Sequence, residues 1–469
     1  MRKSETDTIA AIATPIGEGG ISVIRISGNQ AVEIAAKIFQ GRSSLTAAKT
    51  HSAHFGKVID DQGNVVDDVV ATVFLEPNSF SGENTAEISC HGGLFVTKRI
   101  LELLLKEGAR HAEPGEFTKR AFLNGKLDLS QAEAVADLIQ ARTETAHRAS
   151  IRQLEGVLSE RIHRLRSNLI DSIGLLELEL DFVEEDLEFV DKKGFRESVR
   201  TGIEEIEDLL KSFSAGRIYR EGVKVVIVGP PNAGKSSLLN ALLESNRAIV
   251  TDVPGTTRDT IEETVDIQGI SFKLVDTAGL RETQDVVERE GVRRTEDEVS
   301  TSDIVLLVID VSKGIENPDS ARIKEFIGGL STIPQRQIIV LNKSDLPSQP
   351  VSKILDFFQL ALDSRYLAIS ARTGFGLDKL QEILVETTFS GKRPGNDDSA
   401  TVTNLRHYEA LRRAKDSLKL SLDSLERRQS GEFVAVDLRT ALDCLGEVTG
   451  EVTTDDILNN IFSKFCVGK

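Results

Sequence analysis

The spacing of hydrophobic residues divides the chain into regions with different expected secondary structure. Near the N-terminus, two runs rich in β-branched residues, 21–26 and 65–74, are bounded by Gly, Asn and Pro, as strands commonly are. A helical run follows over 96–105, after the break at Gly92-Gly93. We therefore expect residues 1–118 to form an α+β domain.

Helical spacing dominates the next region. Leucines and isoleucines from Leu154 to Leu180 follow one another at intervals of four and three, which predicts one stripe of a single long helix. For the acidic run at 184–191, a solvated face is the ordinary explanation and a metal or partner site the alternative. The same spacing returns from Leu405 to Leu425, after a linker at 390–399. Segments 119–219 and 386–469 are thus expected to build one helical domain.

Between the two helical segments, strands alternate with helices. The runs 223–228, 304–309 and 338–341 are almost wholly apolar, as is typical of strands buried on both faces of a parallel sheet. This pattern predicts an α/β domain at 220–385, inserted into the helical domain.

Composition excludes several classes of protein. The net charge of −17 argues against a domain that holds nucleic acid by charge alone, although a local patch or a partner could still contact RNA. The cysteines Cys90, Cys444 and Cys466 are too few for a disulfide framework, which fits a reducing compartment. No apolar run approaches the roughly 18 residues of a membrane span, and no signal peptide is recognisable. We therefore expect a cytoplasmic protein without a membrane anchor.

One motif determines the expected chemistry. Gly229-Pro-Pro-Asn-Ala-Gly-Lys-Ser236 matches the phosphate-loop pattern G-x-x-x-x-G-K-[ST] and lies between an expected strand and an expected helix, as the pattern requires. Backbone amides of such a loop wrap phosphate oxygens. Lys235 is expected to reach the β- and γ-phosphates, and Ser236 to ligate Mg²⁺.

Further elements of a Ras-like GTPase follow in order. Asp276-Thr-Ala-Gly279 resembles the D-x-x-G element, Asn342-Lys-Ser-Asp345 the guanine-reading N-K-x-D, and Ser370-Ala-Arg372 the loop behind the base, while Thr256-Thr257 would lie in switch I. A carboxylate such as Asp345 can accept two hydrogen bonds from guanine, and adenine offers no such pair. The order of these elements predicts a GTP-binding G domain.

Two groups needed for hydrolysis are not at their usual positions. Leu280 stands where Ras-type enzymes have the Gln that orients the attacking water, so Glu288 is our candidate, with a solvated helix face as the alternative. No arginine finger is evident. Asn232 could instead ligate a monovalent cation beside the phosphates, or could simply form a turn.

Motifs along the whole chain support a resemblance. They are residues 10–20 (AAIATPIGEGG), Arg25-Ile-Ser-Gly28, Glu87-Ile-Ser-Cys-His-Gly-Gly93, residues 114–126, Thr251-Asp-Val-Pro-Gly-Thr-Thr-Arg-Asp259, Asp276-Thr-Ala-Gly-Leu-Arg-Glu282 and the terminal Phe465-Cys-Val-Gly-Lys469. With these motifs the chain resembles the MnmE (TrmE) family of tRNA-modification GTPases over essentially its whole length.

The resemblance implies a function, cofactors and partners. Members of the family modify C5 of the wobble uridine (U34) of certain tRNAs to aminomethyl or carboxymethylaminomethyl derivatives. They act as homodimers with a flavin-dependent partner, MnmG (GidA), and use a reduced folate, 5-formyl- or 5,10-methylene-tetrahydrofolate. Their GTPase is stimulated by potassium.

The resemblance also implies the site residues. The folate contacts would be Arg25, Glu87, Lys126 and Lys469. Potassium ligands would be Asn232, Thr251, Val253 and Thr256, and Mg²⁺ ligands Ser236 and Thr257. The catalytic residues would be Glu288, Lys235, Asn232 and Cys466; for Cys466, a small packed residue remains the alternative to a nucleophile.

The nucleotide contacts expected in all are Asn232, Ala233, Gly234, Lys235, Ser236, Ser237, Thr251, Asp252, Val253, Pro254, Gly255, Thr256, Thr257, Asp276, Thr277, Ala278, Gly279, Asn342, Lys343, Asp345, Ser370, Ala371 and Arg372. A regulatory or ribosome-assembly switch without one-carbon chemistry is the alternative function.

Overall fold

The structure is a computed structural model that describes residues 7–181, 192–245, 262–276, 297–313, 336–347, 350, 352–353, 356, 366–389, 400–427 and 429–469. It divides into two compact units, each described separately below. The first unit comprises Met1–Gln140, Ser150–Leu210 and Arg406–Lys469, and the second Ala141–Ala149 and Lys211–Leu405. The second unit is therefore inserted between segments of the first.

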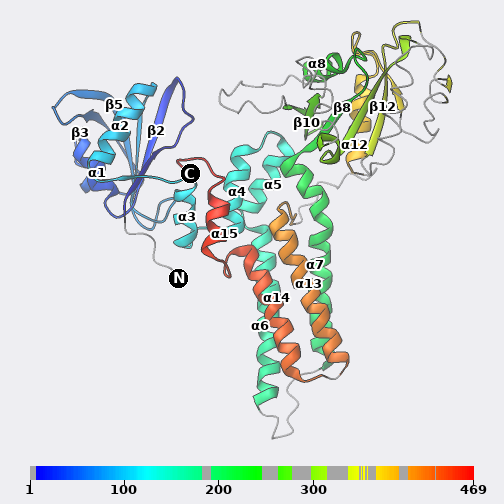
Figure 1. The fold of residues 1–469 in the computed structure, drawn as a ribbon. Helices are drawn as coiled ribbons and strands as arrows, with labels where there is room; N and C mark the ends of the chain where they lie inside the picture. Colours follow the sequence, from blue (N-terminus) through cyan, green and yellow to red (C-terminus); the bar gives the residue numbers. More distant parts are fainter. Residues whose placement is uncertain are drawn as a thin grey trace. The chain divides into compact units, whose positions relative to one another are not determined.

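A mixed sheet forms the N-terminal part of the first unit (Figure 1). Its order is β3-β4-β5-β6-β2-β1-β7, and all neighbours are antiparallel except β1 and β7. The strands are β1 (Ile9–Ile12), β2 (Gly19–Ser27), β3 (Phe39–Gly41), β4 (Ser52–Ile59), β5 (Val65–Phe74), β6 (Thr85–Gly92) and β7 (Arg110–His111). The expected strands at 21–26 and 65–74 are confirmed as β2 and β5.

One face of this sheet is covered by helices, and the opposite face carries both polar and apolar side chains. Helices α1 (Ala31–Ile38) and α2 (Leu94–Lys106) pack with the sheet around one hydrophobic core, with the short 3₁₀ turn η1 (Leu45–Ala47) beside α1. Because side chains alternate along a strand, Ile24 and Ile88 point into this core. Arg25 and Glu87 therefore lie on the opposite face.

The rest of the first unit is helical. It contains α3 (Glu116–Leu123), α4 (Leu129–Gln140), α6 (Val157–Asp181), the first part of α7 (Lys192–Glu221), α13 (Leu405–Glu426), α14 (Gly431–Thr449) and α15 (Asp455–Phe462). The expected apolar stripe is buried at Leu158, Ile162 and Leu165 and continues along α6.

The single long helix was expected to include Leu154, and this prediction is wrong. Leu154 ends a separate helix, α5 (Glu144–Leu154), and α6 begins only at Val157. Gly156 adopts a φ of 89° between them, a left-handed conformation that ends a helical turn. The acidic run at 184–191 lies outside the described residues, as does the side chain of Leu180.

A second, mostly parallel sheet forms the core of the second unit. Its order is β13-β12-β11-β8-β10-β9, and only β9 is antiparallel to its neighbour. The elements are β8 (Val223–Val228), α8 (Lys235–Ser245), β9 (Glu262–Ile267), β10 (Ile270–Asp276), β11 (Ile304–Asp310), η4 (Val311–Lys313), β12 (Arg336–Asn342), β13 (Tyr366–Ala368) and α12 (Leu377–Thr388). The three expected buried strands are confirmed as β8, β11 and β12.

The fold class is thus the expected one: an α+β domain, a helical domain and an inserted α/β domain. The carboxyl ends of the parallel strands meet at one edge of the second sheet, where ligands bind in open α/β folds. In the described part of the chain, no helix is both long and apolar enough to span a membrane.

Candidate functional site

The phosphate loop connects β8 to α8 at the carboxyl edge of the second sheet. Asn232, in the middle of the loop, has a φ of 62°, in the left-handed region that Asn tolerates better than most residues. Gly234 has a φ of 93°, and a Cβ there would lie 2.3 Å from Nδ2 of Asn342. The loop can approach Asn342, at the end of β12, this closely only because residue 234 is glycine.

The two side chains expected to meet phosphate and Mg²⁺ stand at the start of α8. Lys235 is buried, and its Nζ donates to the carbonyl oxygens of Gly229 and Pro230, each at 2.9 Å. Ser236 Oγ donates to Oδ2 of Asp276, at the end of β10, over 2.7 Å. Hydroxyl and carboxylate oxygens are hard ligands, so this pair fits Mg²⁺.

Asn342 and Lys343 fasten the end of β12 to the phosphate loop. Nδ2 of Asn342 donates to the carbonyl of Ala233 at 2.9 Å, and its Oδ1 accepts from the backbone N–H of Ala371 at 3.1 Å. Nζ of Lys343 donates to the carbonyl of Asn232 at 2.9 Å. The two residues therefore join the phosphate-binding loop to the loop expected behind the base.

Asp310 is a member of this cluster that the sequence motifs did not reveal. It ends β11, and its Oδ2 accepts from Nζ of Lys343 at 2.6 Å. Burial would raise the pKa of Asp310, but hydrogen bonds from Lys343 and Ser312 hold it below the usual value. In the sequence, only its position at the end of an expected parallel strand could have pointed to Asp310. That position does not reveal that its side chain pairs with Lys343.

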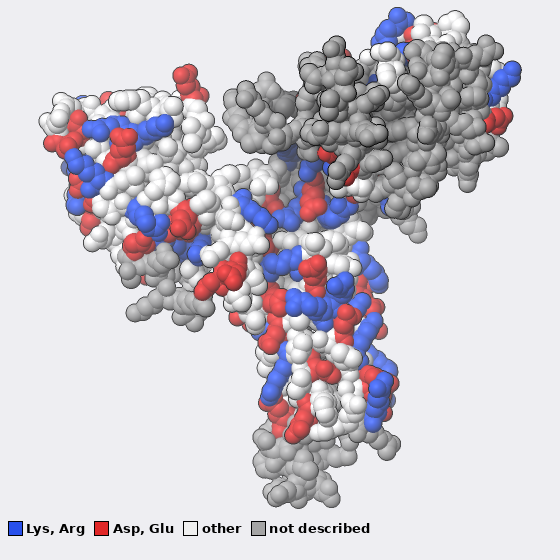
Figure 2. All heavy atoms as spheres, viewed as in Figure 1, with Lys and Arg blue, Asp and Glu red and all other residues white. Residues whose placement is uncertain are grey.

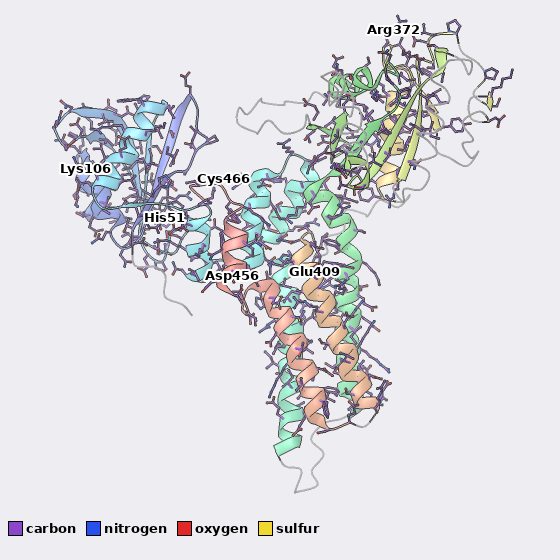
Figure 3. The ribbon with its side chains drawn as sticks, viewed as in Figure 1. His51, Lys106, Arg372, Glu409, Asp456 and Cys466 are labelled. Atoms are coloured by element: carbon purple, nitrogen blue, oxygen red, sulfur yellow. The ribbon has the colours of Figure 1, made fainter. Side chains whose placement is uncertain are left out.

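The expected base-reading carboxylate lies beside its neighbouring loop. Nη2 of Arg372 donates to Oδ2 of Asp345 at 2.8 Å, and Figure 3 labels Arg372 in the second unit. A hydrogen bond from Ser370 lowers the pKa of Asp345, so the group is a carboxylate at neutral pH. An ionised carboxylate that accepts hydrogen bonds is what guanine recognition requires.

Several expected residues lie outside the described part of the chain. They are Thr251, Asp252, Val253, Pro254, Gly255, Thr256, Thr257, Thr277, Ala278, Gly279 and Glu288. Their assigned roles in nucleotide, Mg²⁺ and potassium binding and in hydrolysis therefore stay predictions.

A second polar site lies on the sheet of the first unit, where Arg25 and Glu87 face each other across β2 and β6. Nε and Nη2 of Arg25 are each 2.8 Å from Oε1 of Glu87. Nη1 of Arg25 is buried and has no hydrogen-bond partner among the residues that the structure describes. A buried donor costs free energy unless it is satisfied, so Nη1 marks a place for an acceptor.

The other two expected folate contacts, Lys126 and Lys469, both touch the loop between β5 and β6. Nζ of Lys126 donates to the carbonyl of Pro77 at 3.1 Å. Nζ of the terminal Lys469 lies 5.8 Å from the ring centroid of Phe80, and Cζ of Arg25 lies 5.4 Å from the same centroid. Burial, and then repulsion from Arg25, lower the pKa of Lys469.

A buried charged cluster holds this loop in place, and no sequence motif pointed to it. Ser27 Oγ donates to Glu83 Oε2 at 2.8 Å, and Nη1 of Arg120 lies 3.3 Å from Oε1 of Glu83. Arg120 also pairs with Glu116 and Asp7. Charged groups are seldom buried unless they are paired, so these contacts fix the loop to β2 and α3.

Cys466 lies on the tail that follows α15 (Figure 3). Its thiol is exposed, whereas Cys90 and Cys444 are buried. Its carbonyl accepts from the backbone N–H of Gly115 at 3.4 Å, which brings the tail to the start of α3. Exposure disfavours the role of a packed residue and leaves the thiol accessible for chemistry.

Comparisons with known proteins cover almost the whole chain. The family model described as "GTP-binding protein TrmE N-terminus" matches residues 8–126, and "MnmE helical domain" matches residues 129–466. The chain is 43% identical over 464 residues to the tRNA modification GTPase MnmE of Acetivibrio thermocellus, with 99% of each covered. It is 44% identical over 466 residues to that of Thermoanaerobacter pseudethanolicus, again with 99% of each covered.

Among solved structures, an Aquifex aeolicus Era variant bound to GDP and AlF₄⁻ is 27% identical. The match covers 42% of this chain and 67% of that one, with a TM-score of 0.28. A TM-score this low carries no argument about the fold.

Proposed function

Because the chain belongs to the MnmE family of tRNA modification GTPases, we propose that it hydrolyses GTP to drive modification of C5 of the wobble uridine of certain tRNAs. The observation that carries the proposal is the presence of two separate polar sites in one chain. One is the cluster of Lys235, Ser236, Asp276 and Asn342 at the sheet edge. The other is the Arg25–Glu87 pair.

Residues at this sheet edge divide the tasks of GTP binding and hydrolysis. The loop amides and Lys235 neutralise phosphate charge, Ser236 and Asp276 hold Mg²⁺, and Asp345 selects guanine. We assign the orientation of the attacking water to Glu288, because Leu280 has no group that can orient water. We assign the binding of K⁺ to the side-chain oxygen of Asn232, with Thr251, Val253 and Thr256; the cation would offset negative charge that develops on the phosphates.

The second site fits a reduced folate. Its carboxylate, Glu87, can accept N–H groups of the pterin ring, and the vacant donor of Arg25 can meet a carbonyl or carboxylate. Lys126 and Lys469 supply positive charge for the glutamate tail. When bound, the folate would supply the one-carbon unit, and these four residues would bind and orient it. We assign the role of nucleophile to the exposed thiol of Cys466, three residues before Lys469.

The partners follow from charge and exposed apolar surface. Figure 2 shows acidic and basic side chains interspersed along the helices of the first unit. With a net charge of −17, the chain fits a complex in which the flavin-dependent partner MnmG holds most of the tRNA. Phe55 and Val70 pair across β4 and β5 and are 71% and 38% exposed. We propose that this exposed apolar pair contributes to a homodimer.

The test is complementation in cells that lack their own copy of the gene. Wild-type chain should restore the U34 modification, measured by mass spectrometry of tRNA nucleosides. The variant Arg25→Gln should not restore it, although its purified GTPase rate should match wild type. If adding the wild-type chain left the U34 modification of the deletion cells unchanged, the proposal would be overturned. A regulatory or ribosome-assembly switch would then be favoured.

A further inference from the structure

The ring of Phe80 is shared by two cations. Cζ of Arg25 lies 5.4 Å and Nζ of Lys469 5.8 Å from its centroid, and the residue is 36% exposed. A ring face carries negative quadrupolar potential, so it attracts a cation within about 6 Å. The aromatic ring thus offsets repulsion between two like charges that converge on this site.

The position of the ring is fixed because hydrogen bonds and an ion pair hold the loop between β5 and β6. Oγ of Ser81 lies 2.6 Å from Oγ of Ser27, and the carbonyl of Ser81 accepts from Nδ2 of Asn124 at 2.8 Å. Glu83 is held by Arg120. Phe80 is therefore presented by residues that are themselves tied to β2 and α3.

The C-terminal tail packs against the α+β domain on its way to Phe80. Phe465 is buried and lies 5.4 Å, centroid to centroid, from Phe462. Gly468 has a φ of 98°, and a Cβ there would lie 2.3 Å from the carbonyl oxygen of Ile12 in β1. Only glycine permits this close approach, and the next residue is the terminal Lys469.

We propose that Phe80 is a further positioning residue of this site: its ring docks the terminal Lys469, and this contact holds the C-terminal tail over the Arg25–Glu87 pair. The Lys469 ammonium completes the site only while the tail is docked. An anionic ligand between Arg25 and Lys469 removes their repulsion and holds the tail in place. Because linkage is reciprocal, a docked tail must also bind such a ligand more tightly. Only the ligand's identity rests on the proposed function.

The first experiment measures docking directly on the full-length chain. A carboxypeptidase specific for C-terminal Lys removes Lys469 only when the tail is released, and intact mass reports the loss of one lysine. Phe80→Leu keeps apolar bulk but removes the ring, so Lys469 should be released faster by about 2- to 30-fold, the range of a cation–π contact. All variants share one C-terminal sequence, so the sequence preference of the peptidase does not affect the comparison of their release rates.

Two variants make the result specific. Phe80→Tyr retains the ring and should keep the wild-type rate. Phe433→Leu makes the same substitution at a 62% exposed aromatic residue of α14 and should also keep it. Equal release from wild type and Phe80→Leu would overturn the proposal, as would faster release from Phe433→Leu.

A second arm separates this proposal from the proposed function. Added 5-formyltetrahydrofolate should slow release of Lys469 from wild type, and calorimetry should give a higher Kd for Phe80→Leu. Failure of wild type to bind the folate would overturn the folate assignment alone, since the peptidase rates are measured without it. Folate binding with equal affinity for wild type and Phe80→Leu would overturn the coupling of docking to the ligand.

Discussion

At the scale of single residues, we propose that Asp345 sets the choice of base. Asp345→Asn exchanges an acceptor for a group that also donates, so GTP affinity should fall by roughly 10²-fold or more and xanthosine triphosphate should become preferred. Competition between the two nucleotides measures this preference. Asp378→Asn, in the first turn of α12, is the control and should leave it unchanged. Retained guanine preference in Asp345→Asn would contradict the assignment.

Asp310 is expected to hold Lys343 against the phosphate loop. Asp310→Asn removes the charge of a 2.6 Å ion pair whose carboxylate is 6% exposed, so nucleotide affinity should fall by roughly 10- to 100-fold, the value of a hydrogen bond to a charged group. Equilibrium binding of a fluorescent GDP analogue measures it. Glu382→Gln breaks the exposed pair with Lys379 and should change affinity little. Equal affinities in all three proteins would remove Asp310 from the site.

Glu288 carries the prediction about hydrolysis itself. Glu288→Gln keeps the size of the side chain but loses its charge, so turnover should fall by roughly 10²- to 10⁴-fold while GTP affinity stays nearly intact. Steady-state hydrolysis and nucleotide binding separate the two effects. Unchanged turnover would end the assignment, and the solvated-face explanation would replace it.

The motif residues show which parts of the candidate site could be predicted from the sequence. Order and spacing along the chain placed Lys235, Ser236, Asp276 and Asn342 together, because each follows a parallel strand and those strands end at one edge. Asp310 satisfies the same rule but belongs to no motif. Its role depends on where Nζ of Lys343 points, which only the structure shows.

At the scale of elements, a buried charge cluster joins two helices of the first unit. Glu133 of α4 accepts from Arg406 of α13 at 3.0 Å and lies 2.7 Å from Nε2 of the fully buried His407. Burial alone would raise the pKa of Glu133, but the charges of His407 and Arg406 lower it to about 2. The cluster therefore stabilises the fold only while Glu133 is ionised.

The pH dependence follows from this lowered pKa. The stabilisation is complete above the unfolded-state pKa of about 4.5 and is lost as the pH falls toward 2; its size is about 3 kcal/mol. Glu133→Gln should lower the urea midpoint at pH 7, and the difference from wild type should shrink by pH 3. Circular dichroism follows the transition. Glu426→Gln, from an exposed pair with Arg200, should have little effect. A difference independent of pH would contradict this account.

Periodicity predicts elements better than it predicts their ends. The stripe along α6 was readable because each buried leucine lies one turn from the next. The break before α6 was not, because Leu154 and Leu158 keep the helical interval across it. The buried Glu83–Arg120 cluster was also unreadable, since charged residues are ordinarily on the surface.

At the scale of the whole molecule, an α/β domain inserted in a helical one was evident from the change of period alone. The sequence boundaries themselves stay predictions. The chain passes from one compact unit to the other after Gln140, Ala149, Leu210 and Leu405, and the division after Leu210 falls inside α7. A continuous helix across a boundary gives no change of period that could mark it. Such a helix is suited to carry a two-state change, which we propose links nucleotide state to the folate site.

Potassium dependence tests whether hydrolysis requires a monovalent cation bound beside the phosphates. We expect the GTPase rate to be much higher in KCl than in NaCl at equal ionic strength, because a cation held by the Asn232 oxygen would replace the charge of an arginine finger. Asn232→Gly is the matched variant: glycine accepts the φ of 62° but lacks the oxygen, so the rate should become low and equal in both salts. Equal wild-type rates would place the stabilising charge on an arginine or on the partner protein. The assignment of the GTP site would stand in that case, because it rests on contacts that do not involve the cation.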